Sequence, residues 1–147
     1  MNGISLTFAT TLDVRDRCLC LAAQRAARAL ARRFDEALRP MGLTNGQFSL
    51  LMSLNRPTAP TLSSVATLLA MDRTTLTANL KPLERRGLLT VSQDTKDRRS
   101  RLLHLTEAGR LLLETALPVW IETHDLIDRQ LAAYDGAELR AALNALT

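Results

Sequence analysis

Apolar residues recur at helical spacing along most of the chain, and the clearest case covers residues 73–86. Leu76, Leu80 and Leu83 fall on one stripe of a helix with about 3.6 residues per turn. Asp72 can cap the start of this helix, and Gly87 follows where a helix commonly ends in a left-handed residue. Because the apolar stripe must pack on the domain, the opposite face is available to a partner. That face carries Thr74, Thr77, Ala78, Lys81 and Arg85.

A shorter apolar helix precedes this one, and two extended runs follow it. Thr61 can cap a helix over residues 62–69, after which the chain turns. Residues 88–92 and 101–105 have the composition of short strands, and the polar loop 93–100 joins them. A helix, a turn, a second helix and a hairpin form the plan of a winged helix-turn-helix, whose second helix enters the major groove of DNA.

The loop of the predicted hairpin is cationic. It lacks the Gly, Asn and Pro residues that are typical of a loop that only reverses the chain. Its cations are Lys96, Arg98, Arg99 and Arg101. Arginine suits the narrow and negative minor groove of DNA, and Asp97 is close enough in sequence to orient one guanidinium. The hairpin therefore favours a second contact with DNA.

Three stretches resemble the MarR family of bacterial transcription regulators. They are LTNGQFSLL at 43–51, MDRTTLTANLKPLERRGLL at 71–89 and DRRSRLLHLTEAGR at 97–110. The resemblance extends from Asp13 to the C-terminus and implies a mainly α-helical fold. The winged helix-turn-helix would occupy residues 43–105, between dimerisation helices at 13–39 and 106–147. The DNA-binding residues expected from these motifs are Arg73, Thr74, Thr75, Thr77, Lys81, Arg85, Asp97, Arg98, Arg99 and Arg101.

The function that this resemblance implies is sequence-specific transcription regulation, most often repression. Two copies would bind an inverted repeat of double-stranded DNA, and a small-molecule effector would lower the affinity for DNA. Family members often bind a small aromatic ligand between the long helices and the winged domain. We expect the same kind of effector here, a small aromatic or anionic molecule.

The helices outside the DNA-binding motif indicate a homodimer. An Ala-rich helix is expected from Asp13 to a point before Pro40, and a second long helix over residues 107–132, kinked by Pro118. A capping box at Asp135 opens a last helix. Together these helices carry more apolar residues than a small winged domain could cover, so they are expected to pair with the same helices of a second copy.

Charge is distributed unevenly along the chain, whose formal net charge is +4. Residues 1–60 and 61–101 each hold eight Lys and Arg against four Asp and Glu, whereas residues 102–147 hold three against seven. A nucleic-acid-binding protein is basic where it touches its ligand, so the C-terminal third is expected to face away from DNA.

Neither membrane attachment nor export is expected. Residues 1–12 look like a flexible arm, packed at most through Ile4, Leu6 and Phe8, and lack the basic start and apolar core of a signal peptide. No run approaches the roughly 20 apolar residues of a membrane span. Arginine-rich helix 13–39 also contains acidic residues, which argues against its lying on a lipid surface. A cytoplasmic protein with reduced cysteines is expected.

Enzyme chemistry has little support in the sequence. His104 and His124 have no Cys or His neighbours at metal-ligand spacing, and no glycine-rich nucleotide-binding turn or hydrolase motif is present. We expect no catalytic residue, metal or cofactor. A DNA-architectural protein without sequence preference, and a module whose basic face binds an acidic protein, remain as alternatives. The ratio of specific to non-specific DNA affinity separates them.

Cys18 and Cys20 raise a redox alternative. By resemblance, Cys20 occupies the position of the reactive cysteine in organic-hydroperoxide sensors of this family. On one continuous helix the two side chains would point about 200° apart and could not bridge. Cys20 also borders the Ala-rich stripe, where a small cysteine is often an inert filler. Phe34 and Asn45 stand where those sensors have tyrosines, whose hydroxyls would hydrogen-bond the thiolate. We therefore favour a small ligand as effector and keep Cys20 as the candidate redox residue.

Overall fold

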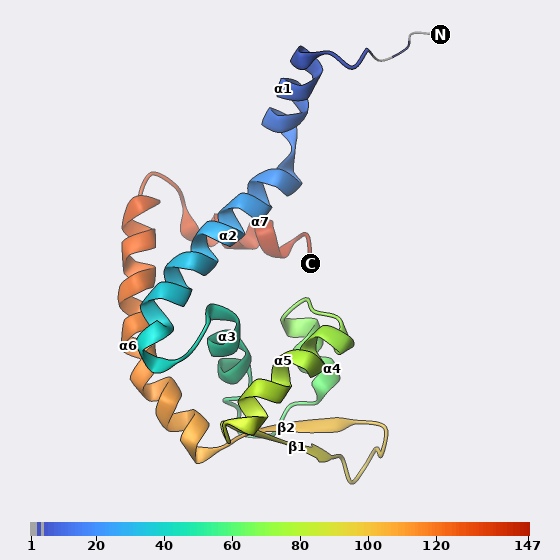
Figure 1. Ribbon diagram of the computed structural model, residues 1–147, viewed down its shortest axis with the longest axis vertical. Helices are drawn as coiled ribbons and strands as arrows, with labels where there is room; N and C mark the ends of the chain where they lie inside the picture. Colours follow the sequence, from blue (N-terminus) through green and yellow to red (C-terminus); the bar gives the residue numbers. More distant parts are fainter. Residues whose placement is uncertain (1–2, 4) are drawn as a thin grey trace. The chain divides into compact units, whose positions relative to one another are not determined.

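The computed structural model describes residue 3 and residues 5–147, and the chain divides into two compact units, Met1–Arg33 and Phe34–Thr147. The elements follow one another as shown in Figure 1. In chain order they are α1 (Phe8–Arg17), α2 (Leu19–Leu38), the 3-10 helix η1 (Arg39–Met41), α3 (Asn45–Ser53), α4 (Leu62–Leu68), α5 (Arg73–Arg85), β1 (Leu89–Gln93), β2 (Arg101–Leu105), α6 (Glu107–Gln130) and α7 (Gly136–Asn144). The expected fold, mainly helical with a two-stranded wing, is confirmed.

The first unit differs from the sequence-based expectation at its start. A helix begins at Phe8, so the expected flexible arm does not extend to residue 12. The cause is a capping box, in which Thr7 accepts a hydrogen bond from the backbone of Thr10 and the Thr10 side chain binds the backbone of Thr7. Leu6 is 90% exposed and Phe8 is 75% exposed, so their expected packing is wrong, whereas Ile4 lies outside the described residues.

A second difference is a break in the expected helix from Asp13 to Pro40. Cys18 has extended backbone angles, with φ −74° and ψ 99°, and separates α1 from α2. Its Sγ accepts a hydrogen bond from the backbone N–H of Leu21 over 3.3 Å. This contact satisfies one of the free N–H groups in the first turn of α2, as a helix cap does. Cys18 and Cys20 therefore do not lie on one continuous helix, and the expected angle of about 200° between their side chains does not apply.

The second unit contains the winged helix-turn-helix. Strands β1 and β2 pair antiparallel, with Leu89 opposite Leu105 and Val91 opposite Leu103. The outer edge of β2 pairs in turn with the segment before α4, because Leu103 donates its N–H to the Pro60 carbonyl oxygen over 2.9 Å. This contact joins the wing to the first helix of the motif. The order helix, turn, helix and hairpin predicted from the sequence is confirmed.

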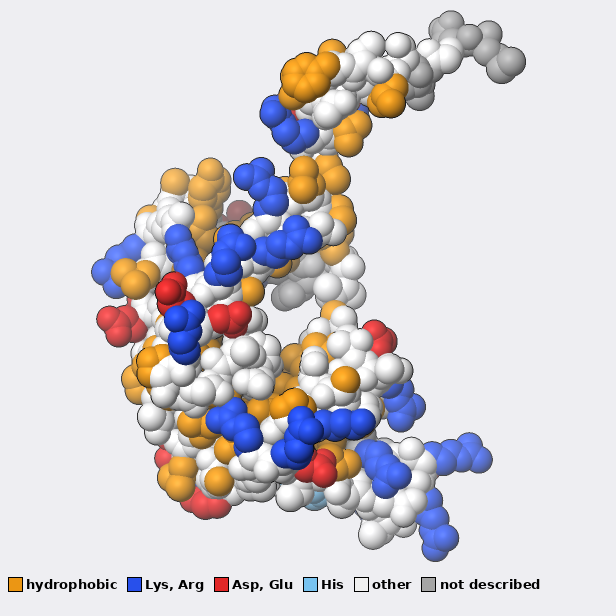
Figure 2. Space-filling model, in the orientation of Figure 1, with side chains coloured by type: hydrophobic (Ala, Val, Ile, Leu, Met, Phe, Trp, Pro, Cys, Tyr) orange, Lys and Arg blue, Asp and Glu red, His pale blue; other side chains and the backbone are white. Residues whose placement is uncertain are grey.

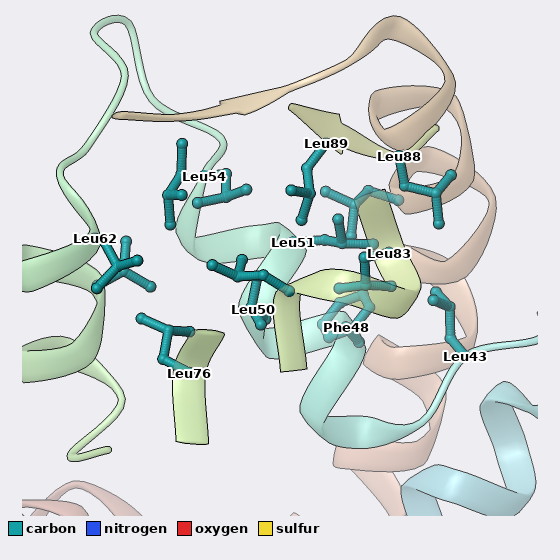
Figure 3. Packing of buried hydrophobic residues seen from close by; sticks show 14 of the residues in the cluster. Leu43, Phe48, Leu50, Leu51, Leu54, Leu62, Leu76, Leu83, Leu88 and Leu89 are labelled. Atoms are coloured by element: carbon teal, nitrogen blue, oxygen red, sulfur yellow. The ribbon is translucent and has the colours of Figure 1, made fainter. Parts of the chain in front are cut away.

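Leucines form most of the core of this unit. Figure 3 shows them converging from α3, α4, α5 and β1 on one another. The largest side chains that are less than 2% exposed are Leu38, Leu51, Leu76, Leu83, Leu89, Leu103 and Val65. Leu76 and Leu83 come from the apolar stripe of α5, so the stripe predicted from helical spacing is the face that packs.

Helix α6 continues without a break through Pro118 to Gln130. Near its start, Gly109 lies against the backbone of Leu88, and a Cβ at this position would collide with the Leu88 carbonyl oxygen. Only glycine lets α6 approach the wing so closely. Across the described residues, no helix is both long enough and apolar enough to cross a membrane.

Candidate DNA-binding surface

Helix α5 is held at its start by Asp72. The carboxylate accepts hydrogen bonds from the backbone N–H of Thr75 over 2.7 Å and from the Thr75 hydroxyl over 2.8 Å. These bonds, that of the backbone first, lower the pKa of Asp72 below its ordinary value of 3.8. The predicted cap is therefore present, and it fixes where the exposed face of the helix begins.

The exposed face of α5 carries the side chains expected to contact DNA. Leu76, Leu80 and Leu83 are buried on the other side. The exposed residues of α5 are Arg73, Thr74, Thr75, Thr77, Ala78, Asn79, Lys81, Glu84 and Arg85, so one carboxylate lies among the cations. Hydroxyl, amide and cationic groups suit base edges and phosphates, so the structure brings together on one helix every α5 residue that the sequence analysis named.

The three threonines of this face differ in their hydrogen bonds. Thr75 donates its hydroxyl to Asp72, and Thr77 donates its hydroxyl to the Arg73 carbonyl oxygen over 2.7 Å. Among the hydrogen bonds of the described chain, none engages the Thr74 hydroxyl. Thr74 is therefore the threonine whose donor is free for a base, whereas the hydroxyl of Thr75 serves the cap.

The wing presents its cations on an ordered turn. Asp97 accepts the backbone N–H of Arg99 over 3.0 Å, and Gln93 donates its side-chain N–H to the Arg98 carbonyl oxygen over 2.7 Å. Arg98, Arg99 and Arg101 are exposed, and none pairs with a carboxylate anywhere in the described part of the chain. The expected contact of Asp97 with the Arg99 guanidinium is thus replaced by one with the Arg99 backbone.

Positive charge gathers over the helix and the hairpin. Figure 2 shows Lys and Arg side chains over the region of α5 and projecting from the end of the wing. Apart from the guanidinium of Arg86, which contacts the Gly42 carbonyl oxygen, these groups lie free of hydrogen bonds within residues 5–147. A row of unpaired cations beside hydroxyl groups provides what a phosphate backbone and base edges require.

Two residues of this region were not found from the sequence. Asn79 is exposed on α5 and donates weakly to the Met71 sulfur over 3.5 Å, and its amide is a group that reads adenine. On a helix it lies about 40° from Leu83, beside the apolar stripe, so helical spacing gave no sign that it would be exposed. Arg86 contacts a residue 44 positions away, and no local pattern could have shown this.

The two histidines serve packing and local hydrogen bonds. His104 Nε2 lies 2.8 Å from the Ser92 hydroxyl across the wing, and His124 Nδ1 lies 3.3 Å from an Asp128 carboxylate oxygen. The His124 ring also lies against Trp120, with 5.0 Å between centroids. Over the described residues, no three His, Cys, Asp or Glu side chains are grouped to hold a metal ion.

Both cysteines are free thiols in the first unit. Cys18 is half-buried and Cys20 is exposed, so Cys20 is not a buried filler within the single chain. The Gln24 side-chain amide donates to Cys20 Sγ over 3.3 Å. Asn45 stands at one of the two positions where peroxide sensors of the family have tyrosines. Its backbone and side-chain N–H groups donate to the Asp35 carboxylate over 2.7 and 2.8 Å.

Comparison with known proteins identifies relatives of the chain. The sequence model of the MarR family matches residues 43–100. The organic hydroperoxide resistance transcriptional regulator of Bacillus subtilis is 32% identical over 101 residues, which cover 69% of this chain and 69% of that protein.

Two solved structures with DNA are similar to the chain. The M. tuberculosis transcriptional regulator MosR in complex with DNA is 37% identical, with a TM-score of 0.76 over 88% of this chain and 93% of that one. The transcriptional repressor CouR bound to a 23-mer DNA duplex is 31% identical, with a TM-score of 0.73 over 90% of this chain and 92% of that one. The chain therefore belongs to the MarR family, and it is a DNA-binding transcription regulator and not an enzyme.

Proposed function

We propose that the protein is a cytoplasmic repressor that binds a specific inverted repeat of DNA as a homodimer and releases it when a small effector binds. The observation that carries the proposal is the exposed face of α5, opposite Leu76 and Leu83, which are both fully buried. A helix anchored by its apolar side presents its polar side outward, where it can reach base edges.

Several groups on this surface have a proposed role. Thr74 donates its free hydroxyl to a base edge, Thr77 contacts a base edge through its methyl group or its hydroxyl oxygen, and Lys81 and Arg85 contact phosphates. Arg98, Arg99 and Arg101 reach the flanking minor groove. Replacing Thr74 with Ala should change sequence preference, whereas replacing Lys81 with Ala should lower affinity for all sequences and reduce its salt dependence.

Uncovered apolar surface in the second unit supports a homodimer. No residue of α7, the whole of which is described, is buried, and Leu139, Leu143 and Leu146 are 42%, 46% and 65% exposed. On α6, Ile121 and Leu126 are 45% and 55% exposed. Apolar patches of this kind mark protein interfaces, and a twofold dimer would cover the same patch on both copies.

Selection of bound fragments from genomic DNA, followed by footprinting, tests sequence-specific binding. A dimer should protect two half-sites whose centres lie about 10 bp, one helical turn, apart. Sedimentation of the protein alone and with the selected DNA gives the stoichiometry. A monomer that protects a single isolated half-site contradicts the dimer, and fragments without a shared sequence favour an architectural protein.

A half-buried aromatic cluster supports an aromatic effector. Trp120 stacks on Phe34 and Phe48, with ring centroids 6.1 and 6.0 Å apart, and lies beside His124. Phe48 is buried, whereas Phe34, Trp120 and His124 keep part of their surface open. Partly open aromatic rings next to an imidazole suit a ligand with a flat apolar body and an acidic group.

A second candidate function is peroxide sensing through Cys20. It is favoured by the exposure of Cys20, by its contact with Gln24 and by the similarity to the B. subtilis organic hydroperoxide regulator. Oxidation of an exposed thiol would then release the DNA.

Cumene hydroperoxide separates the two candidates. DNA release is measured for the wild type, Cys18→Ser and Cys20→Ser, and reversal is tested with dithiothreitol. A small-ligand regulator should keep its DNA in all three cases. Release that persists in Cys18→Ser and disappears in Cys20→Ser establishes the peroxide sensor, and the opposite pattern assigns the reactive thiol to Cys18.

A further inference from the structure

Arg86 connects the end of the recognition helix α5 to the loop between η1 and α3. Its Nη1 donates to the Gly42 carbonyl oxygen over 2.7 Å. The two residues are 44 positions apart, and no other side-chain hydrogen bond in the described chain joins residues so distant in sequence. The contact therefore links two segments that are otherwise held together by apolar packing.

The helix end fixes the backbone of Arg86. Gly87, with φ 72°, donates its N–H to the Glu84 carbonyl oxygen over 2.9 Å, and Leu88 donates to Leu83 over 3.0 Å. This pair of bonds is a Schellman motif, which stops the helix and leaves little freedom at its cap residue. Arg86 is that cap residue, so its side chain leaves the helix from a defined position.

The acceptor is held as firmly. Gly42 has φ 65° and donates its N–H to the Arg39 carbonyl oxygen over 2.9 Å, while Leu43 donates to Leu38 over 3.3 Å. Leu38 is fully buried and Leu43 is 3% exposed, so the loop is anchored in the core. A Cβ at position 42 would lie 3.3 Å from Arg86 Nη2, which shows how closely the guanidinium lies against this backbone.

A directional bond adds what leucine packing lacks. Leu83 is fully buried, but dispersion and burial depend little on small rotations of the helix about its axis. A hydrogen bond to a fixed carbonyl weakens steeply when its angle changes. A restraint at the last turn of α5 therefore limits how far the helix can rotate and how its exposed threonines are presented.

Arg85 differs from its neighbour. Both side chains are exposed, but Arg85 lies about 100° away around the helix and has no hydrogen bond or ion pair within the described residues. Its guanidinium is free for a phosphate, whereas that of Arg86 is engaged by the protein.

We propose that Arg86 is a positioning residue: by binding the Gly42 carbonyl oxygen it sets the orientation of the recognition helix, and it determines sequence discrimination without neutralising a phosphate. The inference rests on the proposed sequence-specific binding. Arg85 and Arg86 thus have different roles, although the sequence alone does not distinguish them.

The test compares Arg86→Gln with Arg85→Gln. Both variants lose one charge and keep a good helix former, and glutamine at 86 is too short to span the contact. Dissociation constants are measured by fluorescence anisotropy, across a series of salt concentrations, for a selected operator and for a scrambled duplex. Thermal melting reports whether each variant is folded at the assay temperature.

For Arg86→Gln, the ratio of specific to non-specific affinity should fall roughly five- to tenfold, the effect of one weak net hydrogen bond lost in each protomer of the dimer, with an unchanged salt slope. For Arg85→Gln, the slope should fall by about 1.8, about 0.9 for each protomer of the dimer, while the ratio is kept. A smaller folded fraction lowers both affinities equally, so simple destabilisation leaves the ratio unchanged.

Arg86→Lys provides a second test, because an ammonium also donates to a carbonyl. It should keep the ratio within about threefold of the wild type. A reduced salt slope in Arg86→Gln overturns the proposal in favour of a phosphate contact. So does an unchanged ratio in that variant, or a Lys variant as impaired as the Gln variant. If the wild type itself shows no operator preference, the proposed function fails together with this inference.

Discussion

The winged helix-turn-helix and the terminal helices α1 and α7 differ in how much of their apolar surface one chain covers. Leu76, Leu83 and Leu103 of the winged part are fully buried. Neither α1 nor α7, both entirely described, contains a buried residue. The winged part thus has a core of its own, whereas the terminal helices have an apolar side without a covering.

The difference shows that helix caps alone do not make a short helix stable. Thr7 caps α1 and Asp135 caps α7, each by accepting a backbone hydrogen bond in the first turn, as Asp72 does for α5. Helices of 10 and 9 residues are nevertheless marginal in water, because the cost of nucleation is recovered mainly through tertiary packing. The terminal helices are therefore expected to depend on a second copy, and the winged part to be stable without one.

The largest effect is expected from a substitution in the winged core. Replacing the fully buried Leu83 with Ala removes apolar contacts and leaves a cavity, which should lower the free energy of unfolding by about 2–5 kcal/mol. Urea denaturation followed by circular dichroism measures this loss. The loss should be the same at every protein concentration, and a dependence on concentration would show that the winged core also relies on the dimer.

A charge on α7 should act on assembly instead. Replacing Leu143, which is 46% exposed, with Glu should weaken the dimer by about 2–4 kcal/mol, because a carboxylate would be desolvated in the interface. Analytical ultracentrifugation measures the dimerisation constant. Asn144→Glu adds the same charge at a neighbouring polar position and is the control. Equal sedimentation of Leu143→Glu and the wild type would place the interface elsewhere.

A smaller effect, confined to DNA binding, is expected from the wing. Replacing the exposed Arg99 with Ala should weaken binding to all operators by about 1–3 kcal/mol through lost charge and groove insertion. Asp97→Ala should also weaken binding, although it removes a negative charge, because the Arg99 N–H loses its acceptor and the turn loosens. Tighter binding by Asp97→Ala would show that charge alone matters. Neither variant should change the dimerisation constant.

The smallest effect concerns Asp35, which joins the end of α2 to α3. The backbone N–H and then the side chain of Asn45 bind its carboxylate and lower its pKa below the ordinary value of 3.8. Because the folded state has the lower pKa, this stabilisation is present above about pH 4 and is lost as the pH falls through the folded-state pKa.

Asp35→Ala should therefore lower the free energy of unfolding by about 1 kcal/mol at neutral pH and flatten the loss of stability in acid. Thermal melts between pH 3 and 7 measure both. Glu36→Ala, at an adjacent exposed carboxylate, is the control. A wild type and an Asp35→Ala variant with parallel pH profiles would show that the contact contributes nothing.

Local chemistry accounts for the part of the site that was predicted. Helix α5 begins after Asp72 and ends before Gly87, as predicted. Its residues Leu76, Leu80 and Leu83 face the core, as helical spacing indicated. These features depend on residues within a few positions of one another. The exposure of Arg99 and its neighbours on the hairpin likewise agrees with a cationic loop that lacks turn-forming residues.

Features without a local sequence signal escaped prediction. Cys18 breaks the expected long helix, although neither glycine nor proline marks the place. The bonds of Arg86 with Gly42 and of Asp35 with Asn45 depend on where the chain returns after a turn. Helix periodicity describes which side of a helix is apolar, but the partner of a polar side chain is decided by the packing of other elements.

The sequence by itself determined the winged helix-turn-helix, its recognition face and the cationic wing, because caps, helical spacing and charge act over short distances along the chain. Tertiary structure alone decided that Arg86 binds the Gly42 carbonyl oxygen, 44 positions away, while Arg85 makes no hydrogen bond within the described residues. Identical side chains at adjacent positions differ only in what surrounds them, and those surroundings are contributed by segments remote in sequence.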